Sequence, residues 1–264
     1  MNISVTGHKG EAGSVIIKNM RKKGHECNSY LERGLDGQST DVVIHAAAKH
    51  PNDTVDEILI SNIIYQKKVV DDCKNADADF ISLSSVSIYN VTDRFINEKT
   101  EIAPVDSYGF SKFFGERYAM LKGVFGYSLR LPALLCVNNR SNLMGRIVER
   151  LIKGESILLT NPDLPFNSYV DPEDISEFVD FYNGCKSFQA VNFAVNPSLT
   201  LYETVCILKE LLLSSSIISK GHENGMHRVY HTDKLKHLTG FEFSQPECAL
   251  ERWVNRIRMN TELK

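Results

Sequence analysis

The sequence predicts an α/β protein built on a doubly wound parallel sheet, with a small C-terminal lobe. Strand-like and helix-like segments alternate through the first half of the chain, beginning with a strand, a glycine turn and a helix in "NISVTGHKGEAG". Strands that alternate with helices favour parallel pairing through right-handed crossovers, which place helices on both faces of the sheet. The second half is less regular, and this change in pattern indicates the added lobe.

Periodicity and turn signals define the expected elements. In the first half we expect strands over 2–7, 41–48, 78–89 and 126–135, and helices over 11–23, 56–75 and 107–123. In the second half we expect helices over 141–154, 201–215 and 247–259, a strand and turn over 168–175, and a strand over 189–195. The resulting division is a first domain over 1–135, to which the strand near 189–195 returns, and a lobe over 136–188 and 196–264.

Composition narrows the class of function. The 264 residues carry a formal net charge of −3, which gives no basic field for nucleic acid or an anionic membrane, so we expect a small-molecule partner. The first residues lack a secretory pattern, and no apolar run reaches the roughly 18 to 20 residues of a membrane span. The six cysteines form no CxxC pair, which argues against a zinc site and a disulfide framework. We expect a cytoplasmic protein without a bound metal.

The glycine turn after the first strand predicts a dinucleotide site. Glycines spaced three apart permit positive φ and a close backbone approach to a pyrophosphate, which then lies on the amide groups of the helix N-terminus. Glycines in such turns also serve tight packing alone, but the strand-turn-helix context favours nucleotide binding. The turn residues expected at the cofactor are Gly7, Lys9, Gly10, Glu11, Ala12 and Gly13.

The choice between NAD and NADP depends on the residues after the second strand. An acidic residue there would bind the ribose hydroxyls of NAD, and the candidate position holds Leu31 or Glu32, followed at once by Arg33. Lys9 and Arg33 could instead flank the 2′-phosphate of NADP, since cationic side chains favour that charge. We therefore expect NADP(H) as the preferred cofactor and NAD(H) as the alternative. Lys9 and Arg33 could also be ordinary solvated surface charges that contact no cofactor.

Tyr108 and Lys112 in "SYGFSK" share one face of an expected helix, one turn apart. A free phenol has a pKa near 10 and is protonated at neutral pH, and a neighbouring ammonium together with a positive nicotinamide stabilises the phenolate and brings its pKa toward the working range. Most such pairs at this spacing are solvated side chains on an amphipathic helix. The surrounding motifs decide in favour of catalysis.

Those motifs together resemble the extended short-chain dehydrogenase/reductase family, the NAD(P)-dependent epimerases, dehydratases and reductases of nucleotide sugars, with a Rossmann sheet and a small substrate-binding lobe. The resemblance covers nearly the whole chain, through "TGHKGEAG", "VVIHAAA", "SLSSVSIY", "YGFSK", "LRLP", "SYVDPEDIS" and "HTDKLKHLTGFEFSQPECALERWV". Each of these motifs alone is weak evidence for the family, but their order and spacing together are specific to it. The resemblance implies an oxidoreductase that moves a hydride between the nicotinamide and a sugar carbon.

The resemblance also implies roles for individual residues. Tyr108 would exchange the proton, Lys112 would hold the nicotinamide ribose, and Ser85 would bind the reacting oxygen, with Ser84 as its close competitor. The further residues implied to contact the cofactor are Ala46, Ala47, Ala48, Asn62, Ser84, Pro132 and Ala133. Plain packing explains alanines in a buried strand equally well, and an asparagine can cap a local turn.

The same resemblance narrows the reaction. Dehydratases of this family carry an Asp and a Glu directly after the catalytic Ser or Thr, where this chain has Val86 and Ser87, so we expect no dehydration. The cysteine and histidine of the similar GDP-fucose synthase branch are also missing. We expect reduction of the keto group of a nucleotide-linked 4-ketosugar. The alternatives are an NAD-dependent 4-epimerase and a non-catalytic dinucleotide-binding regulatory protein.

The substrate side is less specific. Gly24 and Asp41 lie too close for the usual second strand, helix and third strand, so we expect a trimmed sheet on the adenine side. The family's pyrophosphate-binding arginine is Asn167 here, and Arg140 or Arg146 could replace it. Substrate candidates are therefore Ser87, Asn138, Asn142, Arg146 and Asn167, each equally open to an ordinary loop role. The resemblance further implies a homodimer through the helices at 56–75 and 108–122.

Overall fold

The fold is described from a computed structural model of the chain, over residues 1–30, 34–35, 39–90, 94–138, 142–223 and 227–262. The chain forms two compact units. The first comprises Met1–Asn90, Glu98–Leu131 and Ile175–Asn192, and the second comprises Val91–Asn97, Pro132–Asp174 and Phe193–Lys264. Within the described part of the chain, no helix combines the length and the apolar character that crossing a membrane requires.

The first unit is built on a parallel sheet, which in the described residues has six strands in the order β10-β6-β4-β3-β1-β2. Every neighbouring pair in this order is parallel. The strands are β1 (Asn2–Thr6), β2 (Glu26–Ser29), β3 (Val42–His45), β4 (Asp79–Ser85), β6 (Gly126–Leu131) and β10 (Phe188–Asn192). The predicted doubly wound parallel sheet is therefore confirmed.

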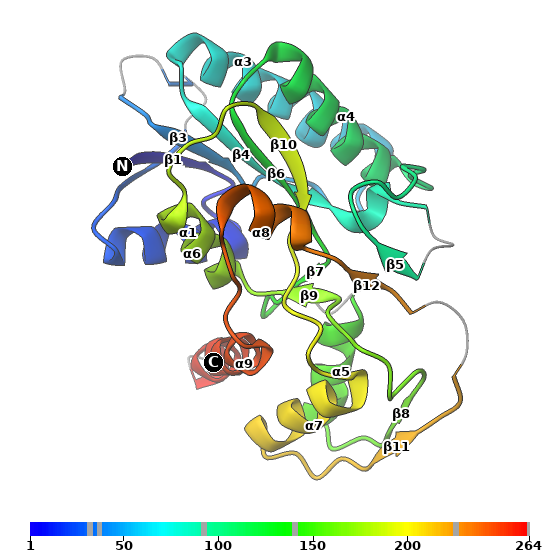
Figure 1. Ribbon diagram of the computed structural model, residues 1–264. Coiled ribbons are helices and arrows are strands. Elements are labelled where there is room, and N and C mark those ends of the chain that lie inside the picture. The colour runs from blue at the N-terminus through cyan, green and yellow to red at the C-terminus, as the bar shows by residue number, and fades with distance from the viewer. Residues whose placement is uncertain (31–33, 36–38, 91–93, 139–141, 224–226, 263–264) are drawn as a thin grey trace. The chain divides into compact units, whose positions relative to one another are not determined.

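Helices cover both faces of this sheet (Figure 1). On one face lie α1 (Glu11–Lys22) and α6 (Pro172–Phe181), and on the other lie α3 (Gln66–Ala76) and α4 (Ser107–Lys122). The core under α3 and α4 consists of apolar side chains that the helices and strands bury together, among them Val43, Val69, Val70, Cys73, Phe80 and Ala119. Burial of this apolar surface supplies the main favourable free energy of folding.

The order of the strands places a topological switch at β1. The chain runs from β1 to β2 on one side and then crosses to β3 on the other side of β1. In open α/β sheets, ligands bind in the crevice outside the carboxyl ends of the strands at such a point. The sheet order ends at β2, as expected from the short span between Gly24 and Asp41.

Two expected elements differ in the structure. The helix expected over 56–75 is interrupted by a π-helical stretch, η1 (Leu59–Tyr65), which lies between the short α2 (Val55–Ile58) and α3. The strand expected over 78–89 ends at Ser85, whose hydroxyl accepts a hydrogen bond from the Ser87 amide and begins the 3₁₀ turn η2 (Val86–Ile88). A serine side chain that bonds its own backbone competes with strand pairing in this way.

The second unit has its own core. Its helices are α5 (Leu143–Ile152), α7 (Leu201–Leu211), α8 (Asp233–Thr239) and α9 (Pro246–Glu262). Its short strands pair as β5 (Phe95–Ile96) with β12 (Val229–Tyr230), β7 (Ala133–Leu134) with β9 (Tyr169–Val170), and β8 (Ile157–Leu159) with β11 (Ile218–Lys220). Apolar side chains from α5, α7 and α9, including Met144, Val148, Val205, Leu208 and Trp253, pack together.

The division into units differs from the expected one in its details. The first unit ends at Leu131 rather than at 135, and it includes most of α6 together with β10. The sequence pattern at 168–175 predicted a strand and a turn but gave no sign of α6, which begins at Pro172 with two acidic residues in its first turn. The segment Val91–Asn97 belongs to the second unit because β5 pairs with β12.

Candidate active site

The turn after β1 is shaped by glycines at two close backbone contacts. Gly7 adopts a positive φ of 65°, and a Cβ atom there would lie 2.7 Å from the Ala47 nitrogen. A Cβ atom at Gly13 would lie 2.4 Å from the Gly7 carbonyl oxygen. Real Cβ contacts do not come this close, so only glycine lets α1 and the segment after β3 pack against the turn.

This turn fits a dinucleotide. The residue that caps the N-terminus of α1 is Gly10, which has no side chain to cover the first helical amides, and its own amide donates to the Gly7 carbonyl at 2.9 Å. Glu11 and Ala12 of the first turn are half-buried, and Lys9 is exposed. Amide groups and a positive helix dipole directed at a crevice form a site for an anionic pyrophosphate.

The segment after β3 forms the neighbouring wall. Ala46, Ala47 and Ala48 are half-buried, and the Ala47 amide donates to Thr6 Oγ1 at 3.1 Å. The same Thr6 oxygen lies 3.0 Å from Nδ1 of the buried His45. These contacts fix the ends of β1 and β3 against each other, directly beside the glycine turn.

Asn62 joins this wall to α4. Its side chain is fully buried in the π-helical η1, where it accepts from the Lys49 amide at 2.8 Å and donates to the Lys49 carbonyl at 3.1 Å. It also donates to Ser111 Oγ on α4 at 3.1 Å. Through these three hydrogen bonds, the Asn62 side chain joins the segment after β3 to α4, the helix that carries Tyr108.

The beginning of α4 lies against the end of β4. Asp106 caps the helix, accepting from the Gly109 amide at 2.7 Å. A Cβ atom at Gly109 would lie 2.5 Å from the Ser87 carbonyl oxygen, so glycine is required for α4 to approach the turn η2 this closely. This approach brings Tyr108 near Ser85, whose hydroxyl favours the phenolate and acts to lower the pKa of Tyr108.

Lys112 lies one turn further along α4 and is 4% exposed. Its ammonium donates to the Leu83 carbonyl of β4 at 2.8 Å, and its Nζ lies 5.6 Å from the centre of the Tyr108 ring. Tyr108 itself is half-buried. The structure therefore gathers Ser85, Tyr108 and Lys112 at the carboxyl end of β4.

Of the two neighbouring serines, Ser85 is the one that reaches Tyr108. Ser84 donates to the Glu116 carboxylate at 2.6 Å, on the side of the sheet that α4 covers. Ser85 donates to Ser87 Oγ at 2.9 Å and accepts from the Ser87 amide at 3.1 Å. Ser87 therefore fixes the position of the Ser85 side chain through these two hydrogen bonds.

Burial governs the charges in the cluster. It raises the pKa of Tyr108 to about 12, although the Ser85 hydroxyl acts in the opposite direction. Burial also lowers the pKa of Lys112 to about 8, against the attraction of Glu116. The pKa of His45 falls to about 3, through burial first and then the charge of Lys112. In the free protein the pKa of Tyr108 is therefore raised, because desolvation of the phenolate dominates, and the expected lowering by Lys112 together with the nicotinamide stays a prediction.

The second unit contains a separate hollow of about 430 Å³. Its lining combines cationic and apolar side chains from α5, from β8 and from the segments before β9 and β12, including Leu143, Arg146, Ile147, Arg150, Leu159, Phe166, His227 and Arg228. Phe166 and His227 lie with ring centres 6.2 Å apart. Its volume lies within the range of sites for small ligands, and its cations favour an anionic one.

The other predicted contacts in the second unit have distinct positions. Pro132 and Ala133 are half-buried at the start of this unit, and Asn138 is exposed. Asn142 caps α5 by accepting from the Gly145 amide at 2.8 Å. Arg146 is exposed on α5 and lines the hollow.

Asn167 has a structural position. It is fully buried, donates to the Val195 and Tyr230 carbonyls, and accepts from the Tyr230 amide at 3.0 Å. These bonds join three segments of the second unit. Arg33 lies outside the described residues, as do Leu31, Glu32 and Arg140.

The site contains several residues that were not predicted from the sequence. Gly109 and Asp106 position Tyr108, while Glu116 accepts from Ser84 and lies one turn beyond Lys112. The Gly after Tyr108 and the Asp before the helix were visible as a helix start, but the close approach of Gly109 to Ser87 needed the fold. Nothing in the local sequence marked Arg228 as part of a cationic hollow.

Comparison with known proteins shows the family to which the chain belongs. The family model for the NAD dependent epimerase/dehydratase family matches residues 27–183, which is more than half of the chain. The protein therefore belongs to the NAD dependent epimerase/dehydratase family, and the predicted family is confirmed.

Solved structures agree on the fold. The UDP-glucose 4-epimerase of Thermotoga maritima with UDP-glucose has a TM-score of 0.79 at 18% identity, covering 99% of this chain and 100% of that one. The UDP-N-acetylglucosamine 4-epimerase of Bacillus cereus has a TM-score of 0.77 at 21% identity, with 98% and 99% covered. The Bordetella bronchiseptica enzyme WbmG in complex with NAD and UDP has a TM-score of 0.78 at 18% identity, with 97% and 95% covered.

The depressed pKa of Lys112 predicts a specific dependence of stability on pH. Below pH 8 the amine is charged in both the folded and the unfolded chain, so its burial lowers the unfolding free energy. As pH rises from about 8 to 10.5 the folded protein holds a neutral amine, and this destabilisation disappears. Lys112→Met should therefore have a higher free energy of unfolding than wild type at pH 7. This difference should shrink by about 3 kcal/mol by pH 10.5, as measured in urea titrations.

Lys122→Met is the matched control for this measurement. Lys122 lies on the same helix but is exposed, and its pKa is raised by a hydrogen bond with Asp71. Its amine stays mostly charged in the folded chain over this pH range and loses its proton in the unfolded chain only near pH 10.5, so the corresponding difference should change far less than that of Lys112→Met. A Lys112→Met difference that is independent of pH would show that the amine is not desolvated.

Proposed function

We propose that this protein is an NAD(P)-dependent oxidoreductase that reduces the keto group of a nucleotide-linked 4-ketosugar. The observation that carries the proposal is the cluster of Ser85, Tyr108 and Lys112, with Lys112 one helical turn from Tyr108, at the edge of the sheet where the glycine turn follows β1. A dinucleotide bound along the glycine turn supplies the hydride. The chain itself then has to supply the proton and hold the reacting oxygen.

Tyr108 is suited to donate that proton. Its pKa of about 12 keeps the phenol protonated in the free protein at neutral pH. A ketone oxygen placed beside the phenol and the Ser85 hydroxyl would accept hydrogen bonds from both, and the oxygen would take the Tyr108 proton as its negative charge develops. The Lys112 ammonium favours the phenolate that remains, because the opposite charges attract at close range.

Dehydration is not supported by this site. The positions after Ser85 hold Val86, which has no acidic group, and Ser87, whose amide and hydroxyl both bond Ser85. Among the described residues, neither Ser85 nor Tyr108 makes a hydrogen bond to a carboxylate. Proton and hydride exchange at one carbon is the simplest chemistry that remains.

A second candidate function is nucleotide-sugar 4-epimerisation with tightly held NAD. The similar structures favour it, since two of them are described as UDP-sugar 4-epimerases and a third as a complex with NAD and UDP. Both reactions use the same proton carrier and differ in whether the hydride returns to the sugar. The proposed NADP preference depends on Lys9, which is exposed near the turn, and on Arg33.

The hollow of the second unit supports a nucleotide-linked substrate. Cationic side chains that line a volume with apolar and aromatic walls match a nucleoside diphosphate, whose phosphates need cations and whose base needs flat apolar contacts. We propose that Arg146 and Arg228 face the diphosphate, and that Phe166 contributes to the base site. Asn167 is left out of this set because its amide is used by backbone groups.

Replacing the proton donor tests the function directly. Wild-type protein should oxidise NADPH or NADH in the presence of one member of a panel of nucleotide 4-keto-6-deoxysugars. Tyr108→Phe should lower kcat about 100-fold or more with little change in cofactor affinity, because only the proton transfer is lost. Tyr118→Phe, on the same helix, should keep wild-type turnover.

The outcomes of this assay separate the candidate functions. Conversion of UDP-glucose or UDP-N-acetylglucosamine to its 4-epimer, with NAD released only on denaturation, would establish the epimerase instead. Cofactor binding without any turnover would favour a regulatory protein. Equal rates for Tyr108→Phe and wild type would refute the role of the phenol.

The hollow makes a binding prediction of its own. Arg146→Ala should weaken UDP binding about 10-fold in isothermal titration calorimetry, since it removes a cation from the diphosphate without touching the core. Arg258→Ala removes a cation from α9, away from the hollow lining, and should leave the affinity unchanged. Unaltered UDP affinity in Arg146→Ala would exclude this arginine from the nucleotide site.

We further propose that the protein forms a homodimer through η1 and α4. Apolar side chains on these packed helices are solvent-exposed in the single chain, namely Ile60, Ile64, Phe110, Phe114 and Leu121. Wild-type protein should sediment at twice the chain mass of 29.8 kDa at micromolar concentration, and Leu121→Asp should sediment as the monomer. Leu238→Asp, a matched exposed change on α8, should stay dimeric. A monomeric wild type would exclude this interface.

A further inference from the structure

The first unit contains an ion pair that is almost fully buried. The side chains of Glu116 on α4 and Arg130 on β6 are only 4% and 6% exposed. Arg130 Nη2 lies 2.7 Å from Glu116 Oε2, and its Nε lies 3.1 and 3.2 Å from the two carboxylate oxygens. Buried pairs of this kind add little stability compared with well-packed apolar side chains, because both charges must be desolvated. The pair therefore calls for a reason other than stability.

One end of the pair holds the strand that carries the reacting groups. The Glu116 carboxylate accepts from Ser84 Oγ at 2.6 Å and from Ser128 Oγ at 3.3 Å. The carbonyl of Leu83, just before Ser84, accepts from the Lys112 ammonium, and the hydroxyl of Ser85, just after Ser84, acts on the Tyr108 phenol. Fixing Ser84 therefore fixes both neighbours that touch the catalytic side chains.

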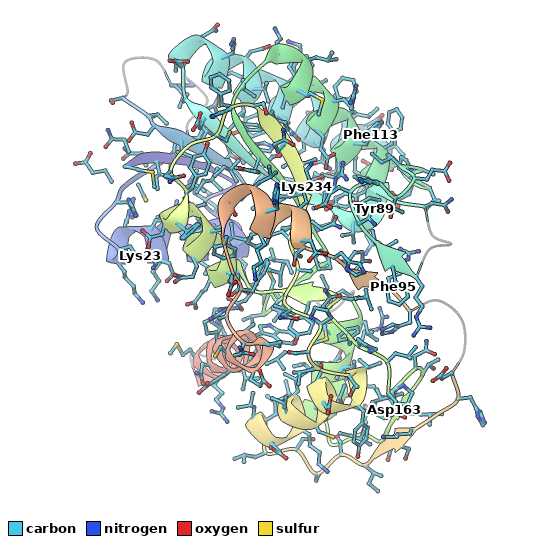
Figure 2. All side chains as sticks on the ribbon, viewed as in Figure 1. Lys23, Tyr89, Phe95, Phe113, Asp163 and Lys234 are labelled. Atoms are coloured by element: carbon cyan, nitrogen blue, oxygen red, sulfur yellow. The ribbon has the colours of Figure 1, made fainter. Side chains whose placement is uncertain are left out.

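The other end of the pair holds the turn that follows. Arg130 Nη1 donates to the Tyr89 hydroxyl at 2.8 Å, and that hydroxyl donates to Asn192 Oδ1 on β10 at 2.5 Å. Tyr89, which Figure 2 labels, ends the turn η2 that begins at Ser85. The segment from Ser84 to Tyr89 is thus fixed at both ends by the same ion pair, with Ser85 between them.

Glu116 also faces Lys112 along the helix. The two residues are four apart on α4, on the side that packs on the sheet, and both are buried. The other groups that face Lys112 are the Leu83 carbonyl from β4, the Tyr108 ring from α4 and the neutral His45 from β3. Among the described charged side chains, the Glu116 carboxylate attracts the ammonium and raises the pKa of Lys112 against the effect of burial.

We propose that the Glu116–Arg130 ion pair is a positioning device for the catalytic cluster, which holds Ser85 in place and keeps Lys112 charged. The proposal rests on the proposed function, in which these two residues act with Tyr108. Glu116 and Arg130 are positioning residues, because their contacts reach the cluster only through Ser84, Tyr89 and Lys112. The negative charge beside Lys112 opposes the desolvation that would otherwise neutralise the amine.

The test measures the titration of Lys112 in the free protein and turnover separately. In ¹³C-lysine NMR, with Lys112→Arg to assign the signal, Glu116→Gln should lower the pKa of Lys112 by about one pH unit or more. In the assay, Glu116→Gln should lower kcat about 10-fold or more with little change in KM, and the alkaline limb of the kcat profile should move to lower pH. Glu177→Gln, which breaks an exposed ion pair with Lys23, should change neither the pKa of Lys112 nor kcat.

A double variant separates positioning from stability. Glu116→Leu combined with Arg130→Leu removes both buried charges together, so its unfolding free energy should lie close to wild type even if the single variant folds poorly. The proposal expects the Lys112 pKa and kcat to stay low in this variant. Recovery of kcat together with stability, or a Lys112 titration equal to wild type, would overturn it. If wild type turns over no nucleotide sugar, the proposed function fails, and the NMR titration still decides this proposal.

Discussion

The burial of an amine beside a phenol is the constraint on which the rest of the site depends. Taken out of water, Tyr108 keeps its proton more tightly and Lys112 keeps its proton less tightly, so both groups shift toward their neutral forms. A phenol buried in this way is an uncharged proton donor at neutral pH. The burial lowers stability at neutral pH, a cost that often accompanies active sites.

The fold supplies this arrangement through three close contacts between chain segments. The parallel sheet brings the carboxyl ends of β1, β3 and β4 to one edge, where the glycine turn, the alanine segment and Ser85 meet. Gly7 lets the turn touch Ala47, and Gly109 lets α4 touch Ser87. Asn62 then ties the alanine segment to α4 through Lys49 and Ser111. A polar network behind the cluster, centred on Glu116 and Arg130, occupies the space where an apolar core would otherwise continue.

Sequence patterns could predict the parts of the site that depend on local geometry. The glycine turn and the spacing of Tyr108 and Lys112 each follow from the period of one element. The choice between Ser84 and Ser85 could not be predicted, because it depends on where β4 gives way to the turn η2. Asn167 was expected near the substrate, and only its three backbone partners, distant in sequence, show its structural position. The effect of burial on Tyr108 also required the packed structure, since a helical wheel shows proximity to Lys112 but not desolvation.

We propose that the phenol of Tyr108 is desolvated in the free protein and that the positive nicotinamide of bound NAD⁺ would lower its pKa. Ultraviolet difference titration of wild type against Tyr108→Phe isolates the absorbance of this one tyrosine. Without nucleotide, the account predicts no tyrosinate signal from Tyr108 below about pH 11, and saturation with NAD⁺ should move its onset to clearly lower pH. Titration of the free protein near pH 10, or identical curves with and without NAD⁺, would contradict the account.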